Sequence, residues 1–144
     1  MLRKPSEIII SGKSLEEILN KHKNPLILAG EDLSYADLRG MNLRGADLYC
    51  TNLTGANLSG TDLSNANLEC TKLSGADLSY ANLKNTNLSG VDLSETDLKN
   101  VDLTNADLDY KYLTSEDYIE SVNDFYKDFF KELLDSCKFT DQDL

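Results

Sequence analysis

The chain of 144 residues has no tryptophan, one histidine and two prolines, and only 8% of its residues are aromatic. Its hydrophobic content is therefore mostly aliphatic, so leucine has to supply most of any core. Three cysteines are too few, and odd in number, for a disulfide framework. The N-terminus has no apolar stretch of signal-peptide length, and no hydrophobic run is long enough to span a membrane. These absences predict reduced thiols, cytoplasmic residence and no membrane association.

Positive charge is scarce as well. The 14 Lys and Arg face 25 Asp and Glu, which gives a formal net charge of −11. Such an excess of carboxylates repels nucleic-acid phosphates, so direct nucleic-acid binding is not expected. An acidic surface suits a basic protein partner instead.

The residue sets that catalysis requires are missing. The single histidine, His22, lies in a polar segment that is expected to be a solvated surface. The sequence contains no P-loop, no nucleophile elbow and no dinucleotide-binding glycine motif. No calcium-binding loop of the D-x-D-x-D-G type occurs among the many aspartates. We therefore predict that the protein is not an enzyme and holds no cofactor or metal.

Leucine recurs at every fifth position from Leu28 to Leu113 without a gap, which makes 18 leucines at one spacing. Asp or Asn precedes most of them, and the position before that is Ala or Thr in 12 of the 17 repeats between residues 31 and 115. Five residues rotate a helical side chain by roughly 140°, so these leucines would spiral around a helix. On a straight strand they would alternate between opposite faces. The spacing therefore excludes a helix and disfavours a flat sheet.

The pattern is satisfied by a five-residue unit whose first four side chains point alternately inward and outward before the backbone turns a corner. The small residue and leucine then point inward. Ten of the 17 last positions are Gly or Asn, which tolerate the positive φ of a type II turn. Four corners close a coil of twenty residues, and coils stacked at ~4.8 Å can pair their backbones. Cys50 and Cys70 then share one corner with Cα atoms ~5 Å apart, within disulfide reach, although two reduced thiols are the expected state.

The A/T-D/N-L-x-x repeat resembles the pentapeptide repeat protein family over some 90 of the 144 residues. The resemblance implies an all-β solenoid, a right-handed quadrilateral β-helix with leucine as the inward central residue. Residues 26–115 would then form about four and a half coils. Glu31 and Lys111 occupy the inward small position and Tyr112 replaces Asp or Asn, all near the ends of the repeat. The motif is specific for the fold and much less so for the function.

Both flanks are expected to cover the open ends of the solenoid. In residues 1–25, Ser14 and Glu17 form a capping box that predicts a short helix of about residues 14–23. Ile8 to Ile10 could add either a short strand or a plug, and their periodicity does not decide between these.

Residues 116–144 change to a helical period and predict a C-terminal amphipathic helix with a broad apolar face. This candidate capping or dimer face consists of Tyr118, Val122, Phe125, Tyr126, Phe129, Phe130 and Leu133. Two interpretations stay open: the helix seals the last coil, or its phenylalanines also form a two-fold homodimer contact.

The sequence favours a non-catalytic protein-interaction or scaffold module whose protein partner it does not identify. The alternative follows from the family resemblance, since some pentapeptide repeat proteins act as DNA mimics on topoisomerases. A rod of net negative charge could modulate gyrase or another topoisomerase in that way. At 3.4 Å per base pair, however, a solenoid of roughly 22 Å imitates only about six pairs, which favours the scaffold.

Overall fold

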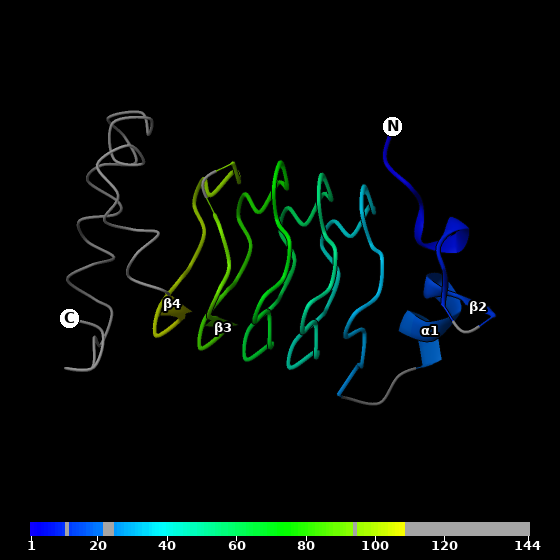
Figure 1. The fold of residues 1–144 in the computed structure, drawn as a ribbon, viewed down its shortest axis with the longest axis horizontal. Coiled ribbons are helices and arrows are strands. Elements are labelled where there is room, and N and C mark those ends of the chain that lie inside the picture. Colours follow the sequence, from blue (N-terminus) through cyan, green and yellow to red (C-terminus); the bar gives the residue numbers. More distant parts are fainter. Residues whose placement is uncertain (11, 22–24, 94, 109–144) are drawn as a thin grey trace.

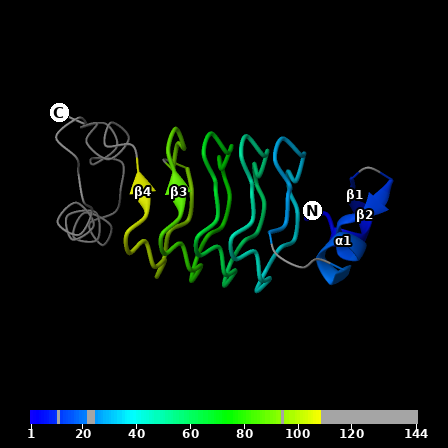
Figure 2. The ribbon, with the colours of Figure 1, turned by 90° about the horizontal axis from the view of Figure 1, so that it is seen from below.

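The computed structural model describes residues 1–10, 12–21, 25–93 and 95–108. Residues 26–108 form a rod of stacked coils, with the N-terminal elements at one end of it (Figures 1 and 2). The elements are η1 (Pro5–Glu7), β1 (Ile9–Ile10), β2 (Lys13–Ser14), α1 (Leu15–Lys21), β3 (Asn87–Leu88) and β4 (Asp107–Leu108). Strands β1 and β2 pair antiparallel, and β3 and β4 pair in parallel.

Each coil of the rod takes twenty residues. Parallel bridges join positions twenty apart, such as Asp32 with Asn52 and Asn52 with Lys72. The N–H of Leu53 donates to the carbonyl of Lys72 at 2.8 Å, and the N–H of Lys72 donates to the carbonyl of Thr51 at 3.0 Å. The straight stretch between two corners is so short that most pairing occurs as isolated bridges rather than strands. The predicted twenty-residue coil is confirmed.

The interior of the rod is a continuous column of leucines. Each leucine of the five-residue series from Leu28 to Leu103 is buried, and none has more than 4% of its surface exposed. Leu108 is partly buried against the same cluster. Since each buried leucine contributes about 2 kcal/mol of transfer free energy, this column is the main apolar support of the fold.

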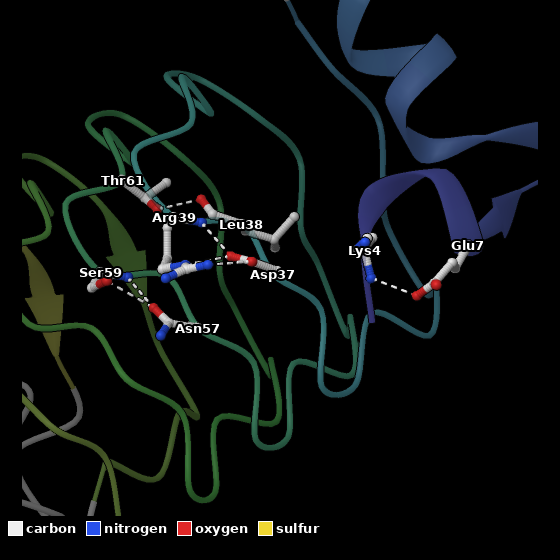
Figure 3. Close-up of polar contacts among 8 residues, drawn as sticks. All are labelled: Lys4, Glu7, Asp37, Leu38, Arg39, Asn57, Ser59 and Thr61. Carbon is white, nitrogen blue, oxygen red and sulfur yellow. Dashed lines mark hydrogen bonds and ion pairs between the residues drawn. The ribbon is translucent and has the colours of Figure 1, made fainter. Parts of the chain in front are cut away.

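Threonine fits the small inward position because its hydroxyl finds a backbone partner. Thr61 is fully buried, and its Oγ1 donates to the carbonyl of Leu38 in the preceding coil at 2.9 Å (Figure 3). Thr51 and Thr71 make the same bond. A buried hydroxyl without a partner costs about 1–3 kcal/mol, so this bond is what allows threonine to alternate with alanine in the core.

The N-terminal cap extends both the ladder and the core. Arg3 forms a parallel bridge with Ala36, and the N–H of Asp37 donates to the carbonyl of Arg3 at 2.7 Å. Ile8 and Ile10 are buried in the same cluster as the leucines. The isoleucine segment therefore contains a strand, β1, and also packs into the end of the core. Covering a sheet edge in this way opposes pairing with another chain.

Helix α1 follows the predicted capping box. The N–H of Ser14 donates to Oε2 of Glu17 at 3.1 Å, and the N–H of Glu17 donates to Oγ of Ser14 at 3.2 Å. The helix begins at Leu15, which is buried, and ends at Lys21. The last two residues of the span predicted from the sequence lie outside the described residues.

Candidate functional site

The last residues of the repeat units from Gly30 to Gly90, together with Asn100 and Asn105, share one left-handed backbone conformation. Gly and Asn at the last position of the unit have positive φ, as predicted. Tyr35, Cys50, Cys70 and Tyr80 take the same conformation, with φ between 53° and 60°. A left-handed conformation costs such residues roughly 1–2 kcal/mol, so the stacked coils must impose it. The preference of Gly and Asn for such turns did not predict positive φ at these four residues, although Cys50 and Cys70 were expected to share a corner. The four residues place large or reactive side chains on the edges of the rod.

The outward Asp and Asn side chains stabilise the corners. Oδ1 of Asn57 accepts the N–H of Ser59 at 3.0 Å and its hydroxyl at 2.8 Å (Figure 3). Each such bond spans two residues, the geometry of an Asx-turn. Amide groups also join neighbouring coils, as where Nδ2 of Asn52 donates to Oδ1 of Asp32 at 3.2 Å. These side chains are therefore bonded to the backbone and to the neighbouring coil.

Hydrogen bonds also hold several of these carboxyls in their charged form. The Thr104 hydroxyl, 2.7 Å from Oδ1 of Asp102, is the largest cause of a lowered pKa at that carboxyl. Hydrogen bonds from Ser34 lower the pKa of Asp32 in the same way. Donors to a carboxylate favour its ionised form. Asp32 and Asp102 therefore stay ionised to a lower pH than an ordinary aspartate.

Charge is divided unevenly between the two halves of the rod surface. We name the two adjoining faces formed by residues 26–35, 46–55, 66–75, 86–95 and 106–108 the acidic side. It carries seven carboxylates and a single basic residue, Lys72, a net charge of −6. The other two faces, residues 36–45, 56–65, 76–85 and 96–105, form the mixed side. It carries five carboxylates and four basic residues, a net charge of −1.

Ion pairs occur on both sides. On the acidic side, Arg3 of the N-terminal segment lies 3.8 Å from Asp32. On the mixed side, Arg39 binds Asp37 through two hydrogen bonds of 2.7 Å (Figure 3). These bonds are the main cause of the lowered pKa of Asp37. Lys84 lies 3.1 Å from Asp102 on the same side. With four basic residues against five carboxylates, the mixed side is nearly neutral, and the excess negative charge of the rod lies on the acidic side.

Three of the exposed large apolar residues lie on the acidic side. Ile27, Tyr35 and Tyr49 are 58%, 52% and 44% exposed. The Tyr35 ring covers Gly55 of the next coil, where a Cβ would lie 2.5 Å from Cε1 of the ring. On the mixed side, Tyr80 is 61% exposed and has the Lys99 ammonium 6.0 Å from its ring centroid. Tyrosines on a rigid surface are typical anchors of protein interfaces.

A hollow of about 440 Å³ also opens on the acidic side. It is bordered by Cys70, Lys72, Gly90, Asp92 and Glu95, together with small and hydroxyl residues of the same faces. Cys50 and Cys70 occupy one corner in successive coils, as predicted, and both are exposed thiols that form no disulfide. The acidic side thus combines negative charge, apolar anchors and a concave surface.

The candidate capping or dimer face predicted at Tyr118, Val122, Phe125, Tyr126, Phe129, Phe130 and Leu133 lies outside the described residues, as do His22, Lys111 and Tyr112. Within the described ranges, no group of three or more His, Cys, Asp or Glu residues is placed to hold a metal ion. In that part of the chain no helix has the length and apolar character of a membrane crossing.

A family model described as pentapeptide repeats matches residues 32–69 and 71–109, in eight copies. Among solved structures, a pentapeptide repeat protein from the thylakoid lumen of Arabidopsis thaliana is similar at 26% identity, covering 74% of this chain and 75% of that one, with a TM-score of 0.38. The pentapeptide repeat protein Rfr23 of the cyanobacterium Cyanothece 51142 is 38% identical, with 62% and 68% covered and a TM-score of 0.37. Trypsin-treated QnrB1, a plasmid-mediated fluoroquinolone resistance protein, is 22% identical, with 75% and 65% covered and a TM-score of 0.41. No curated protein sequence gives a significant match.

Proposed function

The chain belongs to the pentapeptide repeat family, and from that premise we propose that it is a non-catalytic interaction module that binds a basic protein through its acidic side. The observation that carries the proposal is the division of charge, −6 against −1, between two surfaces of the same rod. A field of one sign on one side steers a basic partner toward that side and orients it.

The fold makes this surface well suited to binding. Its backbone groups are paired between coils, and its turns are closed by side-chain hydrogen bonds. A surface that is already ordered loses little conformational entropy when a partner docks. Ile27, Tyr35 and Tyr49 then supply apolar contacts inside a charged surrounding. We propose that the module acts in a reducing compartment such as the cytoplasm, where Cys50 and Cys70 would stay reduced.

The finer architecture is part of the proposal. We propose right-handed coils, about four and a half in number over residues 26–115, with the amphipathic helix of residues 116–144 closing the far end. The twenty-residue period and the family membership support this geometry.

The test compares two matched double variants of the full chain in affinity capture from native lysate. Asp47→Lys with Tyr49→Ala alters the acidic side, and Asp77→Lys with Tyr80→Ala alters the mixed side. Both aspartates accept an N–H two residues ahead and both tyrosines are exposed. Asp47 also accepts Nδ2 of Asn67 at 3.3 Å and Tyr80 lies at a corner of positive φ, so the melting temperature of each variant is compared with that of the wild type before the capture.

The proposal expects a basic partner that the wild type and the mixed-side variant retain and the acidic-side variant loses. Raising the salt concentration should release that partner, because exposed charges are screened beyond a Debye length of ~8–10 Å. Equal retention by both variants would contradict the proposal, as would equal loss from two variants that melt like the wild type.

The alternative partner is the basic DNA groove of gyrase or another topoisomerase, which the acidic side would occupy as a duplex mimic. The negative charge of the acidic side favours this alternative. The nearly neutral mixed side counts against it, because a DNA duplex carries phosphates all around its axis. A supercoiling assay with purified gyrase separates the two. Dose-dependent inhibition at micromolar protein, lost in the acidic-side variant, would replace the scaffold proposal, and unchanged supercoiling would support it.

A further inference from the structure

Backbone pairing between the coils has one exception among the described residues. Elsewhere two bridged residues twenty positions apart share two backbone hydrogen bonds, as at Asn52 and Lys72, and we call such a pair of bonds a rung. The next rung along this face, which would join Lys72 to Asp92, is not formed. In the leucine series from Leu28 to Leu83, only the N–H of Leu73 lacks an acceptor in the adjoining coil.

The open rung leaves two backbone groups of the acidic side without a partner. These are the N–H of Leu73 and the carbonyl of Thr71, and neither makes another hydrogen bond within the described ranges. Both residues are buried, with 1% and 3% of their surface exposed, and both line the hollow of about 440 Å³. A buried backbone group without a partner costs about as much as a lost hydrogen bond. The site therefore favours a ligand that supplies one N–H and one carbonyl.

Two residues of the next coil account for the opening. Glu95 is the last residue of its unit, where Gly and Asn are common, and a left-handed corner is costly for its side chain. The N–H of Gly75 donates to the carbonyl of Glu95, twenty residues ahead, whereas at the other corners from Gly30 to Asn85 the acceptor is nineteen residues ahead. Val91 also lacks the hydroxyl with which Thr71, at the same position, bonds the preceding coil. The register therefore shifts by one residue at this rung.

One residue of an extended peptide has the groups that the open rung lacks. In the rung below, Lys72 uses its own N–H and its own carbonyl, which bond the carbonyl of Thr51 and the N–H of Leu53. A residue of another chain in the same orientation would donate to Thr71 and accept from Leu73. Addition of an extended segment to unpaired backbone groups is a recurrent mode of peptide recognition.

The charges around the hollow indicate which peptide it would accept. The carboxylates of Asp92 and Glu95 border it, against the single ammonium of Lys72. The Ser74 hydroxyl donates to Oε2 of Glu95 and holds that carboxylate at the hollow. Since the whole acidic side has a net charge of −6, basic residues that flank the inserted residue would be attracted to it.

We propose that the open rung is completed by the backbone of one residue in an extended, basic segment of the protein partner. The inserted residue donates its N–H to Thr71 and accepts the N–H of Leu73, and its basic neighbours lie against Asp92 and Glu95. This inference rests on the proposed function, in which a basic protein docks on the acidic side, and it adds the point at which backbone pairing occurs.

The first test uses the unmodified, isotope-labelled full chain and the peptide acetyl-Arg-Val-Arg-Val-Arg-amide. In the free protein the amide of Leu73 should exchange with solvent faster than that of Leu53, and the peptide should slow it. The same peptide with methylated backbone nitrogens keeps its charge but cannot donate. It should bind about tenfold more weakly or less tightly still, because the hydrogen bond to Thr71 is lost from a buried site.

Protection of Leu73 equal to that of Leu53 in the free protein would overturn the proposal, because the rung would then be closed. Equal binding of the methylated peptide would overturn it as well, since charge alone would then hold the peptide. Equal binding of acetyl-Glu-Val-Glu-Val-Glu-amide would contradict the preference for a basic segment.

The second test closes the rung with Val91→Thr and Glu95→Asn, which restore the hydroxyl and a residue suited to the corner. This closed variant should protect the amide of Leu73 and bind the arginine peptide about tenfold more weakly or less tightly still. Glu95→Gln is the matched control, because it removes the same charge without supplying a corner residue, and it should bind more tightly than the closed variant.

Equal binding by the closed variant and by Glu95→Gln would overturn the open rung as a docking point. If the closed variant still captures the basic partner that Asp47→Lys with Tyr49→Ala loses, the open rung is overturned and docking on the acidic side stands. Loss of that partner from the closed variant but not from Glu95→Gln would support both.

Discussion

Replacing Leu63 by alanine is expected to destabilise the protein by about 2–5 kcal/mol. Leu63 is 0% exposed and lies in a column with Leu43 and Leu83 of the adjoining coils. The N–H of Leu43 donates to the backbone carbonyl of Asp62 at 2.8 Å, and the N–H of Leu63 donates to the backbone carbonyl of Asn82 at 2.9 Å. Because the backbone is bonded to a coil on either side, it cannot collapse into the space left by the missing side chain. The loss should therefore lie in the upper half of that range.

Thermal unfolding followed by circular dichroism measures this effect. At roughly 3 °C per kcal/mol for a chain of this size, the melting temperature should fall by about 10–15 °C. The control is Arg44→Ala, an exposed outward position in a neighbouring coil, which should stay within about 0.5 kcal/mol of the wild type. A Leu63→Ala melt within 2 °C of the wild type would show that Leu63 does not point into the core.

Four further outcomes are expected. Thr61→Val should lose about 1 kcal/mol, because the hydroxyl bond to Leu38 disappears from a buried site, and an unchanged urea midpoint would contradict that bond. Hydrogen bonding from Ser64 is the largest cause of the lowered pKa of Asp62 in the folded protein. The Asp62 carboxylate therefore contributes fully to the free energy of unfolding above about pH 4, and this contribution is lost as the pH falls below that. Asp62→Asn, which keeps the acceptor, should therefore lose less stability between pH 6 and pH 2.5, and a steeper loss would refute this reasoning. Gly55→Ala should cost roughly 1 kcal/mol more than Gly60→Ala, since the two φ angles are alike but only at residue 55 does a Cβ meet the Tyr35 ring; equal melting temperatures would show that the ring simply moves away. Light scattering should give the mass of a monomer, because the predicted C-terminal helix is expected to cover the partly buried Leu108 at the end of the described coils. If the wild type has the mass of a dimer and Phe129→Asp has the mass of a monomer, the dimer contact is favoured instead.

The repeat could be predicted from the sequence because its period is incompatible with ordinary elements. Leucine at every fifth position fits neither a helix nor a flat strand, and the glycines and asparagines supply the turn residues at the same interval. The capping box of Ser14 and Glu17 was equally local and is present. Such features depend on neighbours within a few residues, which is the range that sequence patterns describe.

The candidate surface was harder to predict. Tyr35, Cys50, Cys70 and Tyr80 take a conformation that their own preferences disfavour, since stacking against adjoining coils overrides local propensity. Aspartates occur on all four faces, so counting them alone hides the acidic side. Most of the imbalance comes from the basic residues, four of five of which lie on the mixed side within residues 26–108, and the rest comes from seven carboxylates against five. Folding the sequence by twenty and counting both signs would have revealed it.

Inter-coil contacts measured by nuclear Overhauser effects on the labelled full chain would decide whether the coil has twenty residues. Amide protons of residues 52–54 should show contacts to residues 71–73, with the amide of Leu53 protected from exchange by its bond to Lys72. Contacts dominated by residues three and four apart, or a register other than twenty, would contradict the solenoid and with it the acidic side and the open rung.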